Sequence, residues 1–290
     1  MEFRVLSYFM AVAREKNISK AAKSLHLSQP TLSKQLKGLE NELGVVLFER
    51  GNREIKLTDD GIFLYNQGKN ILSLVDKTTS NLKQGKELTG DLYIGAGETR
   101  VMKLIAHTLK KLLQNHPAIK LHFYSGNADD VMDKLNNGVL DFGIVINPTD
   151  KRLYHSIVLP EKDRWGLLIH KHHALSQKKK ILSDDLIDHP LFVSRQSLVD
   201  DQITEWLGGN NDYLSIVGNY NLLYNASLMV EAEIGSALCL EGILQDSSTL
   251  KFIPLYPNLY SSLSVIWKKD HPLSSVAQSF LEELKNRNDS

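Results

Sequence analysis

The sequence has a single cysteine, Cys239, and no uninterrupted apolar run near the roughly 18 residues that a membrane-spanning helix requires. One cysteine excludes an internal disulfide, and the apolar neighbours of Cys239 predict a buried thiol. The N-terminus also lacks a basic segment followed by an apolar one, so no secretory signal is expected. Together these absences predict a cytoplasmic protein that has no membrane partner.

The sequence has no excess of charge of one sign either, because 34 Lys and Arg balance 34 Asp and Glu. The charges are unevenly distributed, however. Residues 1–58 carry ten basic and six acidic side chains, whereas the rest of the 290 residues carries 24 and 28. A basic N-terminal segment joined to an acidic body is typical of a DNA-binding domain fused to a domain of another kind. The chain is long enough for two or three hydrophobic cores.

Two amphipathic helices are predicted at the N-terminus. Apolar residues recur at spacings of three and four over residues 3–15, which predicts a first helix that Asn17 and Ile18 break. Ser19 is expected to cap a second helix, whose small apolar residues would let another helix approach closely. A turn is expected at residues 26–27.

A third helix, predicted over residues 29–43, has two different faces. Ser28 caps it, Pro30 lies in its first turn, where a missing N–H costs little, and Gly44 ends it. Leucines at spacings of four, three and four predict one buried stripe, formed by Leu32, Leu36, Leu39 and Leu43. The side chains off this stripe are polar or basic and lie mostly in the N-terminal half, namely Gln29, Thr31, Ser33, Lys34 and Lys37.

Such a helix is typical of DNA recognition, because the N-terminal half of a recognition helix meets base edges in the major groove. The simpler alternative is the solvated face of an ordinary amphipathic helix. Acids weaken that alternative by appearing only near the C-terminal end, at Glu40 and Glu42. Residues 50–58 predict a turn and a strand, the wing of a winged helix, in which Arg50 and Arg53 could reach phosphates or a minor groove.

These segments resemble the LysR-type transcriptional regulators. The run A-A-K-S-L-H-L-S-Q-P-T-L-S-K-Q-L-K-G-L-E-N-E-L-G-V-V-L-F-E-R, followed by L-T-D-D-G, is similar to the N-terminal domain of that family, without gaps over residues 1–61. The resemblance implies a winged helix-turn-helix, all-α with a small β wing, over residues 1–58, which binds a double-stranded DNA operator. The candidate DNA-binding residues are Ile18, where the family more often has Phe, Ser19, Lys20, Ser28, Gln29, Pro30, Thr31, Ser33, Lys34, Lys37, Arg50 and Arg53.

A long helix is predicted from Thr58 to about residue 84, with Thr58 as its cap and acids in its first turn. It carries more apolar residues than a free linker would leave exposed. We therefore predict that residues 59–89 form a linker helix that a second copy covers in a homodimer. The family resemblance similarly implies dimers and allows a homotetramer. The alternative is that the helix packs only on its own N-terminal domain.

Strands and helices alternate after Gly90, which predicts an α/β domain over residues 90–290. The phrases N-H-P-A-I-K-L-H-F-Y-S-G and L-N-N-G-V-L-D-F-G-I-V-I resemble the effector-binding domain of the same family. The resemblance implies two lobes, like those of periplasmic binding proteins, joined by crossings near residues 159–162 and 261–264. Lobe 1 would comprise residues of about 90–160 and 265–290, and lobe 2 about 161–264.

Ligands of such domains bind beside the carboxyl ends of the strands, where helix N-termini offer free N–H groups. The candidate effector-binding residues at these places are Gly97, Glu98, Thr99, Arg100, Gly126, Ser194 and Arg195. The resemblance implies that Thr99 presents its hydroxyl to a small-molecule effector. Arg195 could pair with a carboxylate or be a solvated loop residue. Glu98 disfavours an anionic ligand, so the charge of the effector is left open.

Two weaker patterns predict no cofactor. Gly95 and Gly97 open a dinucleotide-binding motif, but its third glycine is absent. His170, His172 and His173 lie together, yet no Cys or carboxylate lies at ligand spacing, so a polar loop is expected and no metal site.

The sequence as a whole predicts a DNA-binding transcriptional regulator whose activity a small molecule between the lobes alters. RNA polymerase is a further partner that this function allows. Two alternatives are an enzyme, for which no nucleophile-base motif is found, and a constitutive DNA-binding protein without an effector. The effector, the operator and the direction of regulation are not specified by the sequence.

Overall fold

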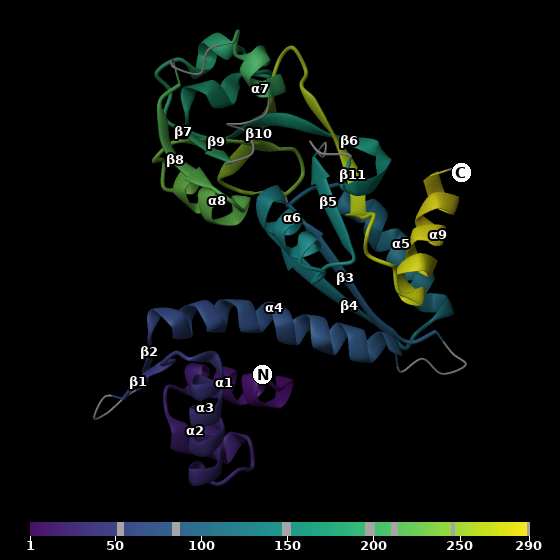
Figure 1. The fold of residues 1–290 in the computed structure, drawn as a ribbon. Coiled ribbons are helices and arrows are strands. Elements are labelled where there is room, and N and C mark those ends of the chain that lie inside the picture. The colour runs from purple at the N-terminus through teal and green to yellow at the C-terminus, as the bar shows by residue number, and fades with distance from the viewer. Residues whose placement is uncertain are drawn as a thin grey trace. The chain divides into compact units, whose positions relative to one another are not determined.

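The computed structural model describes residues 1–50, 55–82, 88–146, 152–194, 201–209, 214–244 and 247–288. These residues form two compact units, residues 1–82 and residues 83–290. Each unit has its own hydrophobic core and is described by itself (Figure 1).

The N-terminal unit is a winged helix followed by a long helix (Figure 1). Its helices are α1 (Phe3–Glu15), α2 (Ile18–Ser24), α3 (Gln29–Leu43) and α4 (Asp59–Leu82). The wing strands β1 (Phe48–Arg50) and β2 (Ile55–Leu57) pair antiparallel. The core residues come from α1, α2, α3 and the start of the wing, and they include Leu6, Phe9, Val12, Ala21, Ala22, Leu32, Leu36, Leu39, Leu47 and Phe48.

The caps of α3 are the predicted ones, because the Ser28 hydroxyl accepts from the Thr31 N–H at 3.3 Å and Gly44 has a left-handed φ of 71°.

Two local predictions are wrong. Asn17, rather than Ser19, caps α2, and its side-chain oxygen accepts from the Lys20 N–H at 2.9 Å. Asparagine is as good a cap as serine, so α2 begins directly after it at Ile18.

The second error concerns the leucine stripe of α3. Leu32, Leu36 and Leu39 are buried as predicted, whereas Leu43 is 40% exposed. Leu43 is the last residue of the helix, before the chain turns at Gly44. The predicted stripe is therefore correct over three of its four leucines.

Helix α4 begins as predicted, since the Thr58 hydroxyl accepts from the Gly61 N–H at 3.0 Å and donates to the Val46 carbonyl at 2.6 Å. One side of α4 packs on the core of its own unit through Leu64, Tyr65, Ile71 and Leu72. At Gly68 a side chain would begin 2.9 Å from the Met10 sulfur, so glycine permits a close approach of α4 to α1.

Helix α4 also leaves apolar residues exposed, namely Ile62, Phe63 and Leu74. The helix thus packs on its own domain, as the alternative predicted, and still presents an uncovered apolar surface. The described part of α4 ends at Leu82, and the predicted helix end at residue 84 and residues 85–87 of the predicted break lie outside the described residues.

The C-terminal unit contains one continuous mixed sheet with the strand order β4-β3-β5-β11-β6-β9-β7-β8, and β10 also pairs with β6. The strands are β3 (Gly90–Ala96), β4 (Ile119–Ser125), β5 (Phe142–Ile146), β6 (Tyr154–His170), β7 (Leu191–Ser194), β8 (Ile216–Tyr220), β9 (Ser236–Leu240), β10 (Leu250–Pro254) and β11 (Tyr260–Lys268). The helices are α5 (Met102–Asn115), α6 (Ala128–Asn136), α7 (Asp201–Trp206), α8 (Leu223–Glu231) and α9 (Ser275–Asn288), with short 3₁₀ turns at Ala174–Gln177 and Ser183–Leu186.

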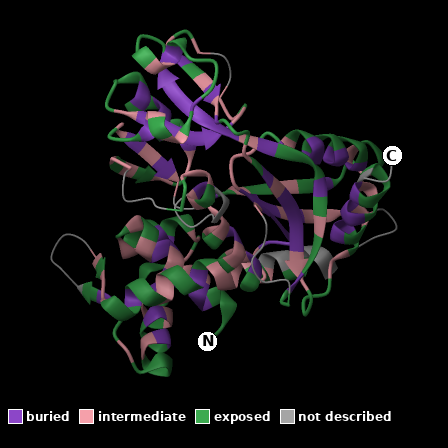
Figure 2. Ribbon diagram, turned by 90° about the horizontal axis from the view of Figure 1, so that it is seen from above, coloured by how far each residue is buried: buried purple, intermediate pink, exposed green. Residues whose placement is uncertain are grey.

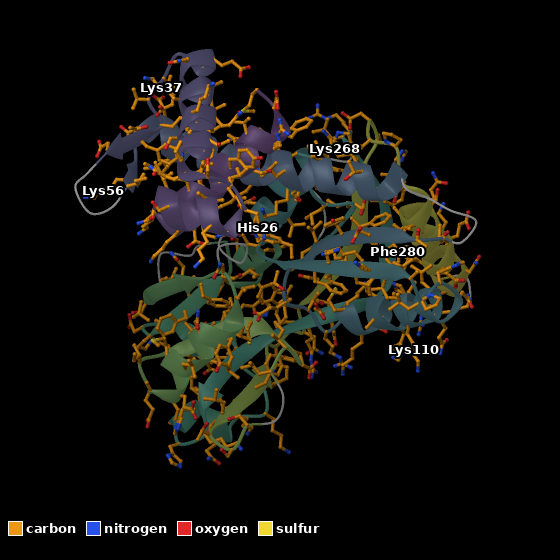
Figure 3. The ribbon with its side chains drawn as sticks, turned by 90° about the horizontal axis from the view of Figure 1, so that it is seen from below. His26, Lys37, Lys56, Lys110, Lys268 and Phe280 are labelled. Carbon is orange, nitrogen blue, oxygen red and sulfur yellow. The ribbon has the colours of Figure 1, made fainter. Side chains whose placement is uncertain are left out.

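The sheet is covered by helices at both ends, which gives the two predicted lobes. In the first lobe, α5 and α9 bury one face of β3 and its neighbours, and α6 buries the other. Phe280 of α9, labelled in Figure 3, packs on Phe142 with ring centroids 5.0 Å apart. In the second lobe, α7 and α8 lie on opposite faces of β6, β9 and β7. Figure 2 shows the resulting pattern, in which buried strand residues are covered by helices with exposed outer faces.

Strand β6 is 17 residues long and belongs to both lobes. Its first part pairs with β11, and its last part pairs with β9 and β10. The register between β6 and β11 shifts between Ser262 and Ser264. The crossings predicted near residues 159–162 and 261–264 fall on this irregular stretch.

Candidate functional site

The exposed side of α3 forms the first candidate site, which we call the recognition surface. Gln29, Pro30, Thr31, Lys34 and Lys37 are exposed, and Ser33 is half-buried. On α2 and its flanks, Ser19, Lys20 and Ser28 are exposed, while the half-buried Ile18 packs against the core. The predicted DNA-binding residues of α2 and α3 thus lie mainly on one accessible and basic surface.

Two hydroxyls at the start of α3 contact each other, because Ser28 Oγ and Thr31 Oγ1 lie 2.7 Å apart. This contact fixes the N-terminal turn of the helix, where the recognition surface begins. A rigid N-terminus would hold Gln29 in a defined direction relative to a base edge.

Neither acid of α3 belongs to the recognition surface. Glu40 Oε1 accepts from the Leu47 N–H at 2.8 Å, and Glu42 pairs with the amino group of Met1. Both carboxylates are therefore engaged in holding the unit together. Lys34 and Lys37 remain exposed on the recognition surface, and basic side chains suit the phosphates of DNA.

The wing carries the two arginines that the sequence predicts to contact DNA. Arg50 ends β1, but its side chain lies outside the described residues, as does the whole of Arg53. Lys56 of β2 is exposed and lies opposite Glu49 across the strand pair (Figure 3). His26, in the turn between α2 and α3, is exposed with a φ of 54° (Figure 3).

The C-terminal unit contains a small pocket at the carboxyl ends of its parallel strands, with a volume of about 60 Å³. Five predicted effector-binding residues line it, namely Gly97, Glu98, Thr99, Gly126 and Ser194. The remaining lining is largely apolar, with Trp165, Leu240 and Leu263 among the contributors. A lining of this composition suits a small molecule that has an apolar body and a few polar groups.

Glu98 joins the two sides of this pocket. Its carboxylate accepts a hydrogen bond from the backbone N–H of Leu223, the first residue of α8. A helix N-terminus attracts negative charge because its first N–H groups have no partner within the helix. Glu98 is also the only charged side chain among the described residues that line the pocket.

Thr99 does not point a free hydroxyl into the pocket in this conformation. Its Oγ1 donates to Asp163 Oδ2 and accepts from the Val101 N–H at 3.0 Å. Asp163 lies on β6, is only 2% exposed, and its Oδ1 has no hydrogen-bond partner among the residues that the structure describes. Burial raises the pKa of Asp163, and the hydrogen bond from Thr99 opposes part of that rise.

Arg100 and Arg195 are not among the described residues that line the pocket. Arg100 lines a neighbouring hollow, where its guanidinium lies 3.9 Å from Glu241. Arg164 binds the same carboxylate in a bidentate way, at 3.1 Å and 2.7 Å. Glu241 therefore holds both arginines away from the pocket. Arg195 lies outside the described residues.

Two further titratable groups near the pocket are buried. The Tyr220 hydroxyl donates to the Leu238 carbonyl at 2.7 Å, and burial raises the pKa of Tyr220. Burial likewise raises the pKa of the Cys239 thiol to about 12. The single thiol is therefore protonated at neutral pH.

Comparison with known proteins covers both units. A family model described as "Bacterial regulatory helix-turn-helix protein, lysR family" matches residues 3–62, and one described as "LysR substrate binding domain" matches residues 85–289. The chain belongs to the LysR family of transcriptional regulators. The predicted winged helix with a two-lobed α/β domain is thus confirmed, and the interpretation as an enzyme is set aside.

Relatives and solved structures agree with this assignment. The chain is 32% identical to the uncharacterized HTH-type transcriptional regulator YwbI of Bacillus subtilis, over 99% of this chain and 96% of that protein. It is 27% identical to a hydrogen peroxide-inducible genes activator of Haemophilus influenzae, over 99% of this chain and 98% of that protein. The crystal structure of CbnR, a LysR family transcriptional regulator, shares the fold with a TM-score of 0.81 at 21% identity, covering 100% of both chains.

Several site residues of this LysR-type regulator are absent from the sequence-based prediction. Lys56 and His26 flank the recognition surface, and the strict alternation along β2 was the available signal for Lys56. Tyr220 and Asn221 line the pocket at the end of β8. The available signal was the end of a strand, as for Gly126.

No helix among the residues that the structure describes is long and apolar enough to span a bilayer.

Proposed function

We propose that this LysR-type regulator binds its DNA operator by inserting the N-terminal half of α3 into the major groove. The observation that carries the proposal is the capped α3, which presents Gln29, Thr31, Lys34 and Lys37 while its acids are engaged elsewhere. Gln29, Thr31 and Ser33 would contact bases, and Ser28 and Pro30 would set the start of the helix against the backbone. Lys20, Lys34, Lys37, Arg50 and Arg53 would bind phosphates, with Ile18 and Ser19 at the edge of the contact.

A homodimer would place two such helices on two half-sites of a pseudo-palindromic operator. The exposed apolar residues Ile62, Phe63 and Leu74 of α4 support a second copy as the cover of this helix. We assign residues 1–58 to DNA binding, residues 59–89 to dimerisation and residues 90–290 to effector binding, with the lobes divided near residues 160 and 264. A regulator of this kind works on DNA in the cytoplasm.

The pocket would bind a small molecule beside Gly97, Glu98, Thr99, Gly126 and Ser194. Arg100 and Arg195 complete the effector-binding residues that we propose from the sequence. The Glu98 carboxylate already satisfies the N-terminus of α8, where an anionic ligand would otherwise bind. We therefore expect the effector to present an amine or another hydrogen-bond donor to Glu98, and an apolar part to the lining that includes Trp165 and Leu240.

Hydrogen peroxide is a poor candidate for the signal, although one relative is named for it. A thiol that senses peroxide has a low pKa and is accessible. Cys239 is buried, and its thiol pKa is about 12.

Selection from random double-stranded oligonucleotides at low ionic strength tests the DNA-binding function. We expect enrichment of a two-fold symmetric site and a steep loss of affinity as salt is raised. Recovery of no preferred site by the folded protein would overturn the proposal. A thermal-shift screen of amines and matched carboxylates tests the effector, because a ligand at 100 times its Kd stabilises the folded state by about 2.7 kcal/mol.

A further inference from the structure

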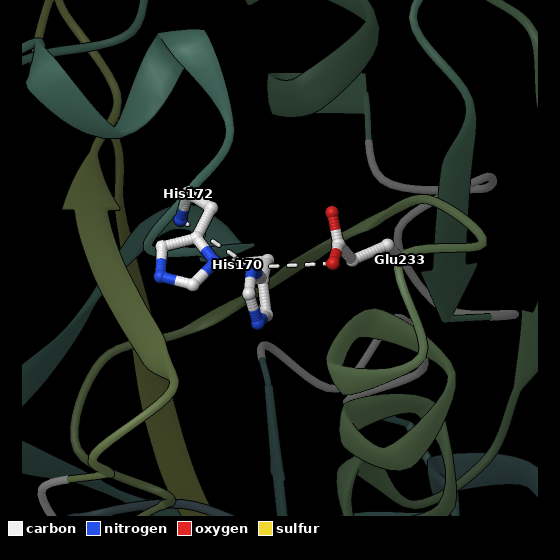
Figure 4. A group of neighbouring side chains, drawn as sticks. All are labelled: His170, His172 and Glu233. Carbon is white, nitrogen blue, oxygen red and sulfur yellow. Dashed lines mark hydrogen bonds and ion pairs between the residues drawn. The ribbon is translucent and has the colours of Figure 1, made fainter.

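A group of metal-ligating side chains lies on the second lobe, among residues that do not line the pocket. His170 ends β6, His172 follows it in the next turn, and Glu233 comes from the distant turn between α8 and β9 (Figure 4). One ligand atom from each lies within 4.8 Å of the others. Among the described residues, no other group of three His, Cys, Asp or Glu gathers in this way. No carboxylate lies near the histidines in the sequence, and for that reason no metal site was expected there. The fold brings the carboxylate of Glu233 to them from a distant part of the chain.

The ring nitrogens face the carboxylate in a usable arrangement. His170 Nδ1 lies 3.9 Å from Glu233 Oε1 and accepts a hydrogen bond from the backbone N–H of His172 at 3.3 Å (Figure 4). An Nδ1 that accepts is unprotonated, and its one lone pair is engaged by the His172 N–H, so a metal ion bound at Nδ1 would have to displace that hydrogen bond. The two imidazole rings are close as well, with centroids 4.8 Å apart.

The spacing is wider than in a filled site, but the side chains can close it. Donors around a tetrahedral Zn²⁺, with bonds of about 2.0–2.1 Å, lie roughly 3.4 Å apart. His172 and Glu233 are exposed and can rotate, whereas His170 is buried and fixed on its strand. One anchored ligand with two adjustable ones would let the site contract by about 1 Å, as those bond lengths require.

The backbone at Glu233 supports a role for its side chain. Glu233 has a left-handed φ of 59°, its N–H donates to the Val230 carbonyl at 3.0 Å, and the Ile234 N–H donates to the Met229 carbonyl at 3.1 Å. This is the position after a helix end that glycine usually occupies, because a side chain there is strained. A glutamate at such a position is unfavourable for the helix end and places a carboxylate opposite His170.

We propose that His170, His172 and Glu233 bind a divalent transition-metal ion of the late first row, with Zn²⁺ as the ion to test first. Two imidazoles and one carboxylate suit Zn²⁺, Ni²⁺, Co²⁺ and Cu²⁺, whereas Mg²⁺ and Ca²⁺ prefer oxygen ligands alone. Three protein ligands leave at least one position for water or another small ligand. Metal binding would tie the end of β6 to the turn after α8.

The test is calorimetric titration of the full-length, untagged and chelator-treated protein with ZnCl₂, and with CoCl₂ followed by visible absorption. We expect one ion per chain, with a Kd in the micromolar range or tighter, and a Co²⁺ spectrum typical of nitrogen and oxygen ligands. His172→Ala and Glu233→Gln should each weaken binding at least about tenfold. His271→Ala, at an exposed histidine elsewhere, is the matched control and should bind as the wild type does.

Glu233→Gly separates a metal site from a structural role. This substitution relieves the left-handed strain, so the variant should be at least as thermally stable as the wild type while losing the metal. The proposal would be overturned if Zn²⁺ binding survived both His172→Ala and Glu233→Gly. It would also be overturned if only His173→Ala abolished Zn²⁺ binding. A wild type that binds no Zn²⁺ would also refute it.

Discussion

The carboxylate of Glu98 accepts a hydrogen bond from the backbone N–H of Leu223, so that an acid after β3 caps the N-terminus of α8 on the opposite lobe. The two residues are 125 positions apart in the sequence. This single bond connects the two sides of the effector pocket and occupies the place most attractive to an anion.

Glu98→Gln keeps a hydrogen-bond acceptor at this position and removes its charge. We expect the free energy of unfolding of the full-length protein to fall by about 0.5–1 kcal/mol, because a charge near a helix N-terminus contributes on that scale. Urea denaturation followed by circular dichroism measures the change. Glu161→Gln, at an exposed position on β6, should leave stability within error. Carboxylate ligands should also bind the Glu98→Gln variant better than the wild type, and unchanged selectivity would contradict the role given to Glu98.

Gln29→Ala and Lys37→Ala should affect DNA binding differently. Loss of Gln29 should relax base preference at one position of each half-site, with a discrimination loss of about 1–3 kcal/mol. Loss of Lys37 should weaken binding uniformly and reduce the slope of log K against log salt by about 1. Fluorescence anisotropy with a panel of operator variants at several salt concentrations separates the two. A uniform loss on Gln29→Ala would exclude base contact by Gln29.

Phe63→Glu should weaken the dimer without unfolding the N-terminal unit. Phe63 is 68% exposed on α4, so its ring contributes little to the core of its own unit. A charge introduced at a helix–helix interface should raise the dimer dissociation constant at least about tenfold, through an unpaired buried charge. Analytical ultracentrifugation measures this, with Asp60→Lys on the same helix as the charge control. An unchanged dissociation constant would place the dimer interface elsewhere.

Asp163 should make stability depend on pH in a defined direction. Since burial raises the folded-state pKa of Asp163 above its unfolded value, the folded state holds the proton more tightly. The associated stabilisation is full below the unfolded pKa of about 3.9 and is lost as pH rises through the folded pKa. Asp163→Asn should therefore flatten the dependence of unfolding free energy on pH from about pH 4 upward. Parallel curves for the two proteins would show that Asp163 titrates normally.

Cys239 should be inert towards oxidants and thiol reagents in the folded protein. The buried thiol, with its pKa of about 12, carries almost no thiolate at neutral pH. Ellman's reagent should react rapidly only after denaturation, and peroxide should leave operator affinity unchanged. Peroxide-sensitive DNA binding that Cys239→Ala abolishes would contradict this expectation.

Local signals predicted much of the fold. The spacing of apolar residues predicts the extent of α1, and Ser28 and Gly44 predict the two ends of α3. The alternation of strands and helices predicts the segments after β3 and β4. The one misplaced cap arose because Asn17 and Ser19 are equally good caps two residues apart, and only the packing of α2 on the core decides between them.

The contacts that define the sites could not be predicted, because they join distant parts of the chain. Thr99 meets Asp163 across 64 residues, and Glu98 meets Leu223 across 125. The sequence suggested that Glu98 matters for ligand charge, and this stays a prediction. It could not indicate that Glu241 would pair with both Arg100 and Arg164.

Strand β6 hydrogen-bonds to β11 at one end and to β9 and β10 at the other. Because both lobes share β6, unfolding of the sheet in one lobe would leave the sheet of the other incomplete. We therefore expect the two lobes to unfold in a single cooperative transition. Any rotation of one lobe against the other must be absorbed as twist in the irregular stretch opposite Ser262 and Ser264, where few ladder bonds need to break.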